Sequence, residues 1–111
     1  MAARCFSLIL GARNTPGAGR RFRRRDDAAI RRITFRHFPQ GFTILNADGG
    51  WFDPAAGHFV AEESRQILVC PSRRADLRPW CRELAAALKQ KELLVIELGG
   101  VASYRARAKT K

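Results

Sequence analysis

Residues 42–70 read FTILNADGGWFDPAAGHFVAEESRQILVC and contain two extended segments on either side of a turn. Residues 42–47 are rich in β-branched and aromatic side chains, which favour a strand. The segment from about 58 to 70 ends in an uninterrupted apolar run at 67–70, which is typical of a strand buried on both faces. Residues 53–57, DPAAG, form a turn signal between the two segments. We therefore expect two strands that pair in an antiparallel hairpin.

Asp48-Gly49-Gly50 within this stretch leaves two interpretations open. In the first, residues 48–57 form one wide loop. In the second, Gly49 and Gly50 make a bulge inside a long twisted hairpin that turns at residues 53–57. We favour the second, because Trp51 and Phe52 continue the apolar pattern and a glycine pair inside a strand usually marks a bulge.

One strand and one helix precede the hairpin. Residues 5–10, CFSLIL, are nearly continuously apolar and predict a strand at the centre of a sheet. Core-type residues then recur at helical spacing, at Ile30, Ile33, Thr34, His37 and Phe38. This spacing predicts a helix over roughly 27–38, which Asp26 or Asp27 begins and Pro39 ends.

A second helix and a last strand follow the hairpin. The clearest amphipathic pattern in the chain consists of Leu77, Trp80, Cys81, Leu84 and Leu88. We expect this helix to begin at an Asp76 cap and to end near Lys91. Residues 93–98 predict the last strand, which residues 101–104 extend beyond two glycines.

The order β-α-β-β-α-β predicts an α+β fold of the ferredoxin-like βαββαβ type. Right-handed connections close such a chain into a two-layer sandwich, with a four-stranded antiparallel sheet and two helices on one face. The strands around Leu8 and Leu68 lie at its centre. We expect one domain over residues 1–104 and a basic, disordered tail over 105–111.

The sheet face without helices leads to a prediction about assembly. Such a face is polar, or a partner covers it, or it binds something. The strands are too apolar for a fully polar face, so we expect a homo-oligomer, most simply a dimer. Its contacts would use the open sheet face or the edge strands.

The charge of the chain indicates an anionic partner. Among 111 residues, Lys and Arg number 21 and Asp and Glu number 10, which gives a net charge of +11. Such a field attracts nucleic acid and other polyanions. The residues that we expect to contact the anion are Arg20, Arg21, Arg23, Arg24, Arg25, Arg32 and Arg36. The alternative is a solvated basic loop and helix face with no specific partner.

The three cysteines, Cys5, Cys70 and Cys81, do not form a recognisable framework. Their number is odd and no C-x-x-C is present, so we interpret them as small buried apolar residues and expect neither a metal site nor a cofactor. The apolar run near the N-terminus is too short to span a membrane or to serve as a signal peptide. We therefore expect a reduced, cytoplasmic protein without a membrane span.

Two stretches resemble the DUF3574 family. Residues 38–51, FPQGFTILNADGGW, are similar to the family pattern F-P-x-G-x-T-x-x-x-A-x-G-x-W, and residues 62–69, EESRQILV, are similar to its E-x-S-x-x-[LI]-x-V. The matched core spans roughly residues 35–70. The family has no established function, so the resemblance implies a fold and no activity. Many members resemble exported lipoproteins, whereas this sequence shows no lipobox.

The same stretches hold the candidate pocket residues, namely Thr43, Trp51, Glu62 and Ser64. Glu62 and Glu63 cannot form a paired acid–base site, because neighbouring strand residues point to opposite faces. Ser64 has no evident base partner, so we assign no catalytic residue.

Three functions follow from these observations. The first is a non-catalytic binding and assembly domain for an anionic partner, and the second is an RNA- or DNA-binding accessory protein. The third is a small enzyme of the dimeric α+β-barrel type, with a pocket near the hairpin.

Overall fold

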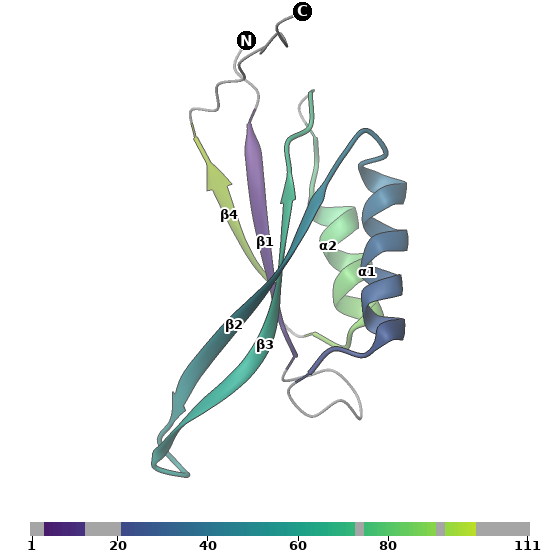
Figure 1. The fold of residues 1–111 in the computed structure, drawn as a ribbon. Coiled ribbons are helices and arrows are strands. Elements are labelled where there is room, and N and C mark those ends of the chain that lie inside the picture. Colours follow the sequence, from purple (N-terminus) through teal and green to yellow (C-terminus); the bar gives the residue numbers. More distant parts are fainter. Residues whose placement is uncertain (1–3, 13–20, 73–74, 91–92, 100–111) are drawn as a thin grey trace, which may run out of the picture.

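The computed structural model describes residues 4–12, 21–72, 75–90 and 93–99. Its elements follow the predicted order (Figure 1) and are β1 (Cys5–Gly11), α1 (Arg24–His37), β2 (Thr43–Asp53), β3 (His58–Val69), α2 (Arg78–Ala87) and β4 (Leu94–Leu98). The predicted extension at 101–104 and the predicted tail at 105–111 lie outside the described residues.

The four strands form one antiparallel sheet in the order β2-β3-β1-β4. Both helices lie on the same side of it (Figure 1). The predicted ferredoxin-like two-layer sandwich is therefore confirmed, with β1 and β3 as the central strands. None of the described helices is long and apolar enough to cross a membrane.

The core lies between the sheet and the helices. Its fully buried side chains come from β1, β3, α1, α2 and the residue that follows α2. They include Leu8, Leu10, Ile67, Val69, Ile30, Trp80, Leu84 and Leu88. The Trp80 Nε1–H donates a hydrogen bond of 3.1 Å to the Thr34 hydroxyl oxygen, which joins the two helices inside the core. Phe38 packs edge-on against the Trp80 ring at 4.9 Å between centroids. The predicted inward faces of both helices are confirmed.

The start of α1 differs from the prediction. The helix begins at Arg24, three residues before the predicted start at 27. The reason is that Asp26 lies inside the first turn, where its Oδ2 accepts a hydrogen bond of 2.7 Å from the Arg23 backbone N–H. The carboxylate thus closes the first turn from within rather than capping it from before.

Helix α2, in contrast, is shorter than predicted at both ends. The helix begins at Arg78, two residues after Asp76, and the Asp76 Oδ1 accepts a hydrogen bond of 3.1 Å from the Arg78 backbone N–H. It ends at Ala87 rather than near Lys91. Lys89 takes a positive φ of 55°, which a continuing right-handed helix cannot accommodate.

Strands β2 and β3 form one long hairpin, whose outer half extends beyond the helices (Figure 1). The prediction of a long hairpin is confirmed, but the prediction of a bulge at Gly49 and Gly50 is wrong. The register runs without a slip from Thr43 opposite Leu68 to Asp53 opposite His58. Side chains of β3 occupy the space above both glycines, as described below.

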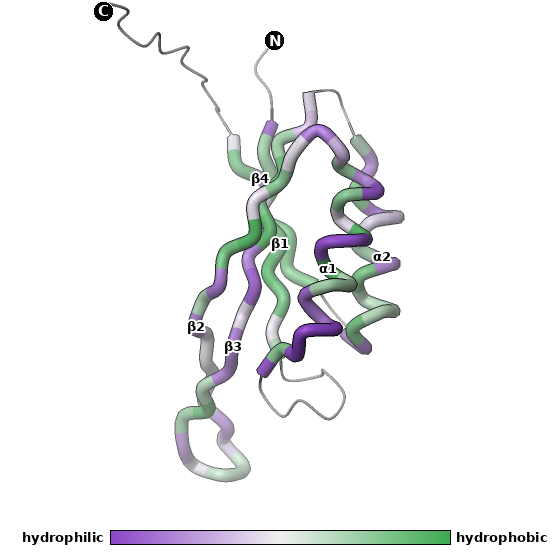
Figure 2. Tube along the Cα trace, turned by 45° about the vertical axis from the view of Figure 1, so that its right-hand side comes forward, coloured by the Kyte–Doolittle hydropathy of each residue, from purple (hydrophilic) through white to green (hydrophobic). Residues whose placement is uncertain are grey.

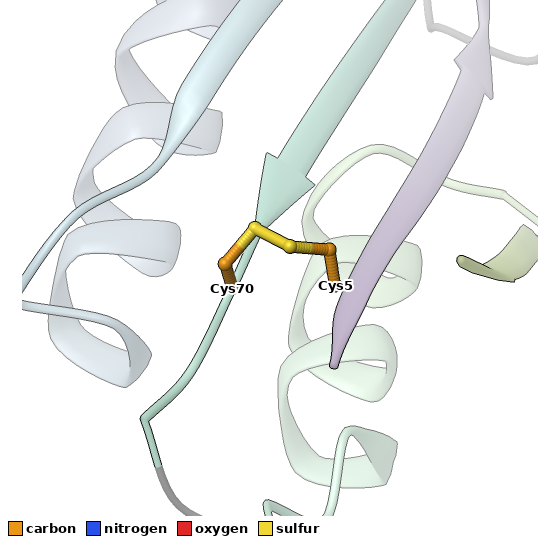
Figure 3. The surroundings of a disulfide bond; sticks show 2 residues. All are labelled: Cys5 and Cys70. Carbon is orange, nitrogen blue, oxygen red and sulfur yellow. A yellow bond between two sulfur atoms is a disulfide. The ribbon is translucent and has the colours of Figure 1, made fainter. Parts of the chain in front are cut away.

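Cys5 and Cys70 form a disulfide (Figure 3), which corrects the interpretation of both as unpaired buried residues. The register explains the pairing, because Phe6 lies opposite Val69 and the cysteines are the next pair along the strands. The two residues are 65 positions apart in the sequence, so spacing gave no sign of the pairing. Cys81 is the free cysteine and is partly buried.

Candidate functional site

The alternation of side chains divides the sheet into two faces with different chemistry. Odd-numbered residues of β1 and β2 and even-numbered residues of β3 and β4 point away from the helices, and we call this side the open face. No described Lys or Arg lies on the strands of the open face. Figure 2 shows β1 and β4 largely in the hydrophobic colour, whereas the hydrophilic colour appears on both helices and on parts of the β2–β3 hairpin.

The outer strand of the open face carries an exposed apolar stripe. Leu94, Ile96 and Leu98 of β4 are 58%, 40% and 38% exposed and point to the same side. Leu45 of β2, at the other edge, is 47% exposed on the same face. We call the three β4 residues the apolar stripe. They face solvent in the single chain, although they are the kind of residue that a folded protein usually buries.

Glu62 and Ser64 lie on the open face beside two glycines. Glu62 pairs with Gly49 of β2, and Ser64 pairs with Gly11 of β1. A Cβ added to Gly11 would lie 2.7 Å from the Glu62 Oε1, and a Cβ added to Gly49 would lie 2.6 Å from the Ser64 Oγ. The absence of side chains at both glycines therefore leaves room for two side-chain oxygens.

The Glu62 carboxylate has an unusual environment. Its Oε2 is buried and accepts no hydrogen bond in the part of the chain that the structure describes. Glu63 faces the helical side, where its Oε1 accepts a hydrogen bond of 2.7 Å from the Phe22 backbone N–H. This confirms that the two adjacent glutamates lie on opposite faces and form no paired site.

The structure places all four predicted pocket residues on the open face but not together. Trp51 lies two residues from Gly49 on the same side of β2 and is therefore diagonal to Glu62, whereas Ser64 lies opposite Ala47, four residues from Trp51. Thr43 lies at the far end of β2, opposite Leu68. Sequence reasoning did not single out Gly11, because a glycine at the end of a strand gave no sign of which side chain lies over it.

Thr43 instead lines a wide depression of about 890 Å³ at the other end of the sheet. The depression lies between the end of α1 and the end of β3, and its apolar wall includes Phe38, Phe42 and Leu68. Cys70 of the disulfide also lines it. Among the described residues that line it, His37 is the titratable side chain, so these residues hold no acid–base pair.

The predicted arginines fall into two groups. Arg24, Arg25, Arg31 and Arg32 are exposed on α1 and form no ion pair with other described residues, and we call these four the basic surface. Arg31 was not among the predicted contacts, although it directly precedes Arg32, which was. Arg21 is also exposed, and Arg20 lies outside the described residues.

Other arginines have structural partners. Arg36 pairs with Glu83 of α2, which also contacts the His37 Nε2 at 2.7 Å. Arg65 lies on the helical side of β3 and donates a hydrogen bond of 2.9 Å from Nε to Asp27. Arg36 is therefore a weaker candidate for anion binding than predicted, because Glu83 already neutralises it.

Comparisons with known proteins support the fold alone. No family model and no curated protein matches the sequence. A solved phage SAM lyase in complex with S-methyl-5′-thioadenosine is 16% identical, with a TM-score of 0.60 over 86% of this chain and 80% of that one.

Two further structures have the same architecture. The periplasmic divalent cation tolerance protein CutA from Archaeoglobus fulgidus is 8% identical, with a TM-score of 0.60 over 94% of this chain and 89% of that one. The GlnK–ATP complex of B. subtilis is 12% identical, with a TM-score of 0.51 over 86% of this chain and 84% of that one. Identities this low carry no residue role over to this chain.

Proposed function

We propose that this chain is a non-catalytic binding domain that assembles with copies of itself through the open face and presents the basic surface of α1 to an anionic partner. The observation that carries the proposal is the separation of charge. The strands of the open face carry no described Lys or Arg, although the chain has a net charge of +11.

This separation favours a second copy as the occupant of the open face. Two chains of charge +11 repel each other, and the repulsion is weakest where basic side chains are absent. Contact through the apolar stripe removes exposed leucine and isoleucine side chains from water, at roughly 25 cal/mol per Å² of apolar area. The basic helical layers of the two copies then point away from each other.

The basic surface suits an extended anion. Arg24 and Arg31 are seven residues apart, as are Arg25 and Arg32, which corresponds to about 10 Å along a helix. The acidic residues of α1 do not offset them, because Asp26 is buried and Asp27 pairs with Arg65. The four guanidinium groups therefore remain available to phosphate or carboxylate groups of a partner.

Native mass spectrometry of the purified chain tests the assembly. We expect an oligomer at micromolar concentration and its loss in Ile96→Lys, because this change places a charge in the apolar stripe. Phe35→Lys is the matched control, since Phe35 is 58% exposed on α1, away from the open face. A monomeric parent chain, or equal dissociation by both variants, would contradict the assembly.

Fluorescence anisotropy with a labelled DNA duplex and with polyphosphate tests the anionic partner. The double variant R31E/R32E removes half of the basic surface and should weaken binding at least tenfold. The control R78E/R82E makes the same charge change on α2, where Arg78 already pairs with Asp76. Equal weakening by both double variants would show that net charge alone, rather than α1, attracts the anion.

We also propose that the chain belongs to the DUF3574 family. Six of the hairpin residues that carry the resemblance share the open face, namely Thr43, Ala47, Gly49, Trp51, Glu62 and Ser64, whereas Ile67 and Val69 point into the core. Residues spread along a sequence pattern are more informative when the fold brings them to one surface. This shared face supports a common binding role for the pattern.

A further inference from the structure

Glu62 differs from the other described glutamates in one carboxylate oxygen, Oε2, for which the described residues provide no hydrogen-bond partner. Glu63 accepts a hydrogen bond from a backbone N–H, Glu83 pairs with Arg36, and Glu97 pairs with Arg4. The Glu62 Oε2 is buried and accepts no hydrogen bond from the described residues. An unsatisfied buried acceptor costs roughly 1–3 kcal/mol, so its presence in a folded chain requires an explanation.

The surroundings of Glu62 are arranged around its oxygens. The Glu62 Oε1 occupies the space above Gly11, and the Ser64 Oγ occupies the space above Gly49. An alanine at either glycine would approach these oxygens to 2.7 or 2.6 Å, closer than a real Cβ tolerates. On the open face, the Glu62 carboxylate therefore leans over β1 and the Ser64 hydroxyl over β2, each above a backbone position without a side chain.

The missing partner must be a hydrogen-bond donor, because an ionised carboxylate only accepts. Among the residues that the structure describes, no Lys or Arg points from the strands to the open side, so none of these strand residues supplies a cationic donor there. The nearest arginine in the sequence, Arg65, points to the opposite face and pairs with Asp27. A positively charged donor from outside gains the most, because charge-assisted hydrogen bonds are about twice as strong as neutral ones.

Trp51 narrows the class of ligand. It is partly buried on the same face as Glu62 and lies diagonally across the strand pair, since Gly49, two residues before it, is opposite Glu62. An indole ring attracts organic cations through its face. A metal ion fits less well, because no three His, Cys, Asp or Glu side chains gather among the described residues and hard cations need several oxygen ligands.

We propose that Glu62, together with Ser64 and Trp51, binds a small organic cation that carries N–H donors, such as a primary ammonium group. The carboxylate accepts the N–H hydrogen bonds, the hydroxyl offers a further acceptor, and the indole provides the apolar wall. The site is formed by residues of one chain, so neither a second copy nor the anionic partner of α1 has to supply a contact, although the site lies on the open face that the proposed assembly uses.

Isothermal titration calorimetry of the full chain tests this site with 1,4-diaminobutane as the probe and 1,4-butanediol as the uncharged control. We expect saturable binding of the diamine and none of the diol. Glu62→Gln keeps the shape of the side chain, removes its charge and should weaken diamine binding about tenfold or more. Glu97→Gln is the matched control, because Glu97 is an exposed carboxylate on the helical side of β4, and it should leave binding unchanged.

Three results would overturn the proposal. The first is the absence of saturable diamine binding by the parent chain, and the second is equal binding by the Glu62→Gln variant. The third combines two observations, namely that Glu62→Gln dissociates an oligomer and that the parent chain does not bind the diamine. A donor from another copy of the chain would then fill the site. Circular dichroism of each variant verifies that it is folded, and Ser64→Ala provides a second variant with an expected smaller loss.

Discussion

Arg65, on the helical side of the sheet, is a charged residue that stabilises the fold rather than facing solvent. Its side chain is 7% exposed, donates to both carboxylate oxygens of Asp27 at 2.9 and 3.3 Å, and lies 4.5 Å from the centre of the Phe22 ring. The guanidinium thereby joins β3 to the start of α1. A planar donor group that also packs on an aromatic ring performs both tasks, which lysine could not.

Arg65→Met should lower the free energy of unfolding by about 1–3 kcal/mol, because it leaves the partly buried Asp27 carboxylate without its donor. Urea denaturation measures the change. Arg36→Met removes the exposed pair with Glu83 and should cost less than about 1 kcal/mol. Similar losses in both variants would show that Arg65 acts as an ordinary surface charge.

The position of Cys81 in the fold affects the pKa of its thiol. Burial raises the pKa of this thiol above its ordinary value, and the negative charge of Asp76 raises it further. A raised pKa leaves less thiolate at a given pH, and the thiolate is the reactive form. Cys81 in the folded chain should therefore react with iodoacetamide at pH 7.5 more slowly than free cysteine.

Mass spectrometry of the alkylated protein measures this rate and the state of the other two cysteines. One label per chain is expected without reductant, since Cys5 and Cys70 are joined. Rapid labelling at three positions would contradict both the disulfide and the protected thiol.

At the scale of elements, the long hairpin and the disulfide define the two ends of the sheet. The disulfide joins β1 to the end of β3 beside the wide depression, whereas the Glu62 site lies where β1 ends. The outer half of the hairpin exposes Phe52 and Phe59, at 60% and 66%, with the Phe59 ring over Gly50. The ring occupies the space that a side chain at position 50 would need, which explains why a glycine fits there.

Replacing both cysteines in C5A/C70A should lower stability by about 2–4 kcal/mol, because the bond closes a loop of 65 residues in the unfolded chain. Thermal unfolding with and without reductant measures the loss. The reductant should lower the melting temperature of the parent chain and leave that of the double variant unchanged. A parent chain insensitive to reductant would show that the bond contributes nothing.

The disulfide also affects the predicted location of the protein. A cytoplasmic location stays a prediction, and the reduced state from which it was argued does not hold in this structure. Disulfides persist mainly in oxidising compartments. Alkylation of the protein in freshly lysed cells, before oxidation, would measure which state the cell maintains.

At the scale of the whole molecule, the separation of charge gives the two faces opposite responses to salt. Salt screens the repulsion between chains of charge +11 but leaves burial of the apolar stripe intact. Arginines that bind phosphates release counterions from the nucleic acid. Added salt makes this release less favourable and so weakens binding. As the salt concentration increases, self-association of the chain should thus become stronger and its affinity for the anion weaker.

Raising the salt from about 50 to 200 mM should tighten self-association and weaken duplex binding, with a logarithmic slope of about −0.9 for each phosphate contact. Sedimentation equilibrium measures the first effect and anisotropy the second. R31E/R32E should reduce the slope of duplex binding by about two. Duplex binding that does not change with salt would exclude the basic surface as its cause.

Sequence periodicity was sufficient for the elements and for their order. Apolar runs at β1 and β3 predicted the central strands, and helical spacing predicted the buried faces of α1 and α2. The bounds were less accurate, as at α1, because a carboxylate acts either before a helix or inside its first turn. The placement of Glu62 and Glu63 on opposite faces also followed from the sequence, since alternation is a local property of a strand.

Only the tertiary structure decided what lies across the strands. The Cys5–Cys70 bond, the cover that Phe59 gives to Gly50, and the position of Gly11 beneath the Glu62 carboxylate all depend on register. Register joins residues that are far apart in the sequence, and a shift of one residue would reverse every face. The amino-acid sequence thus determined which strands and helices form, through local periodicity. Long-range pairing determined which of their side chains meet.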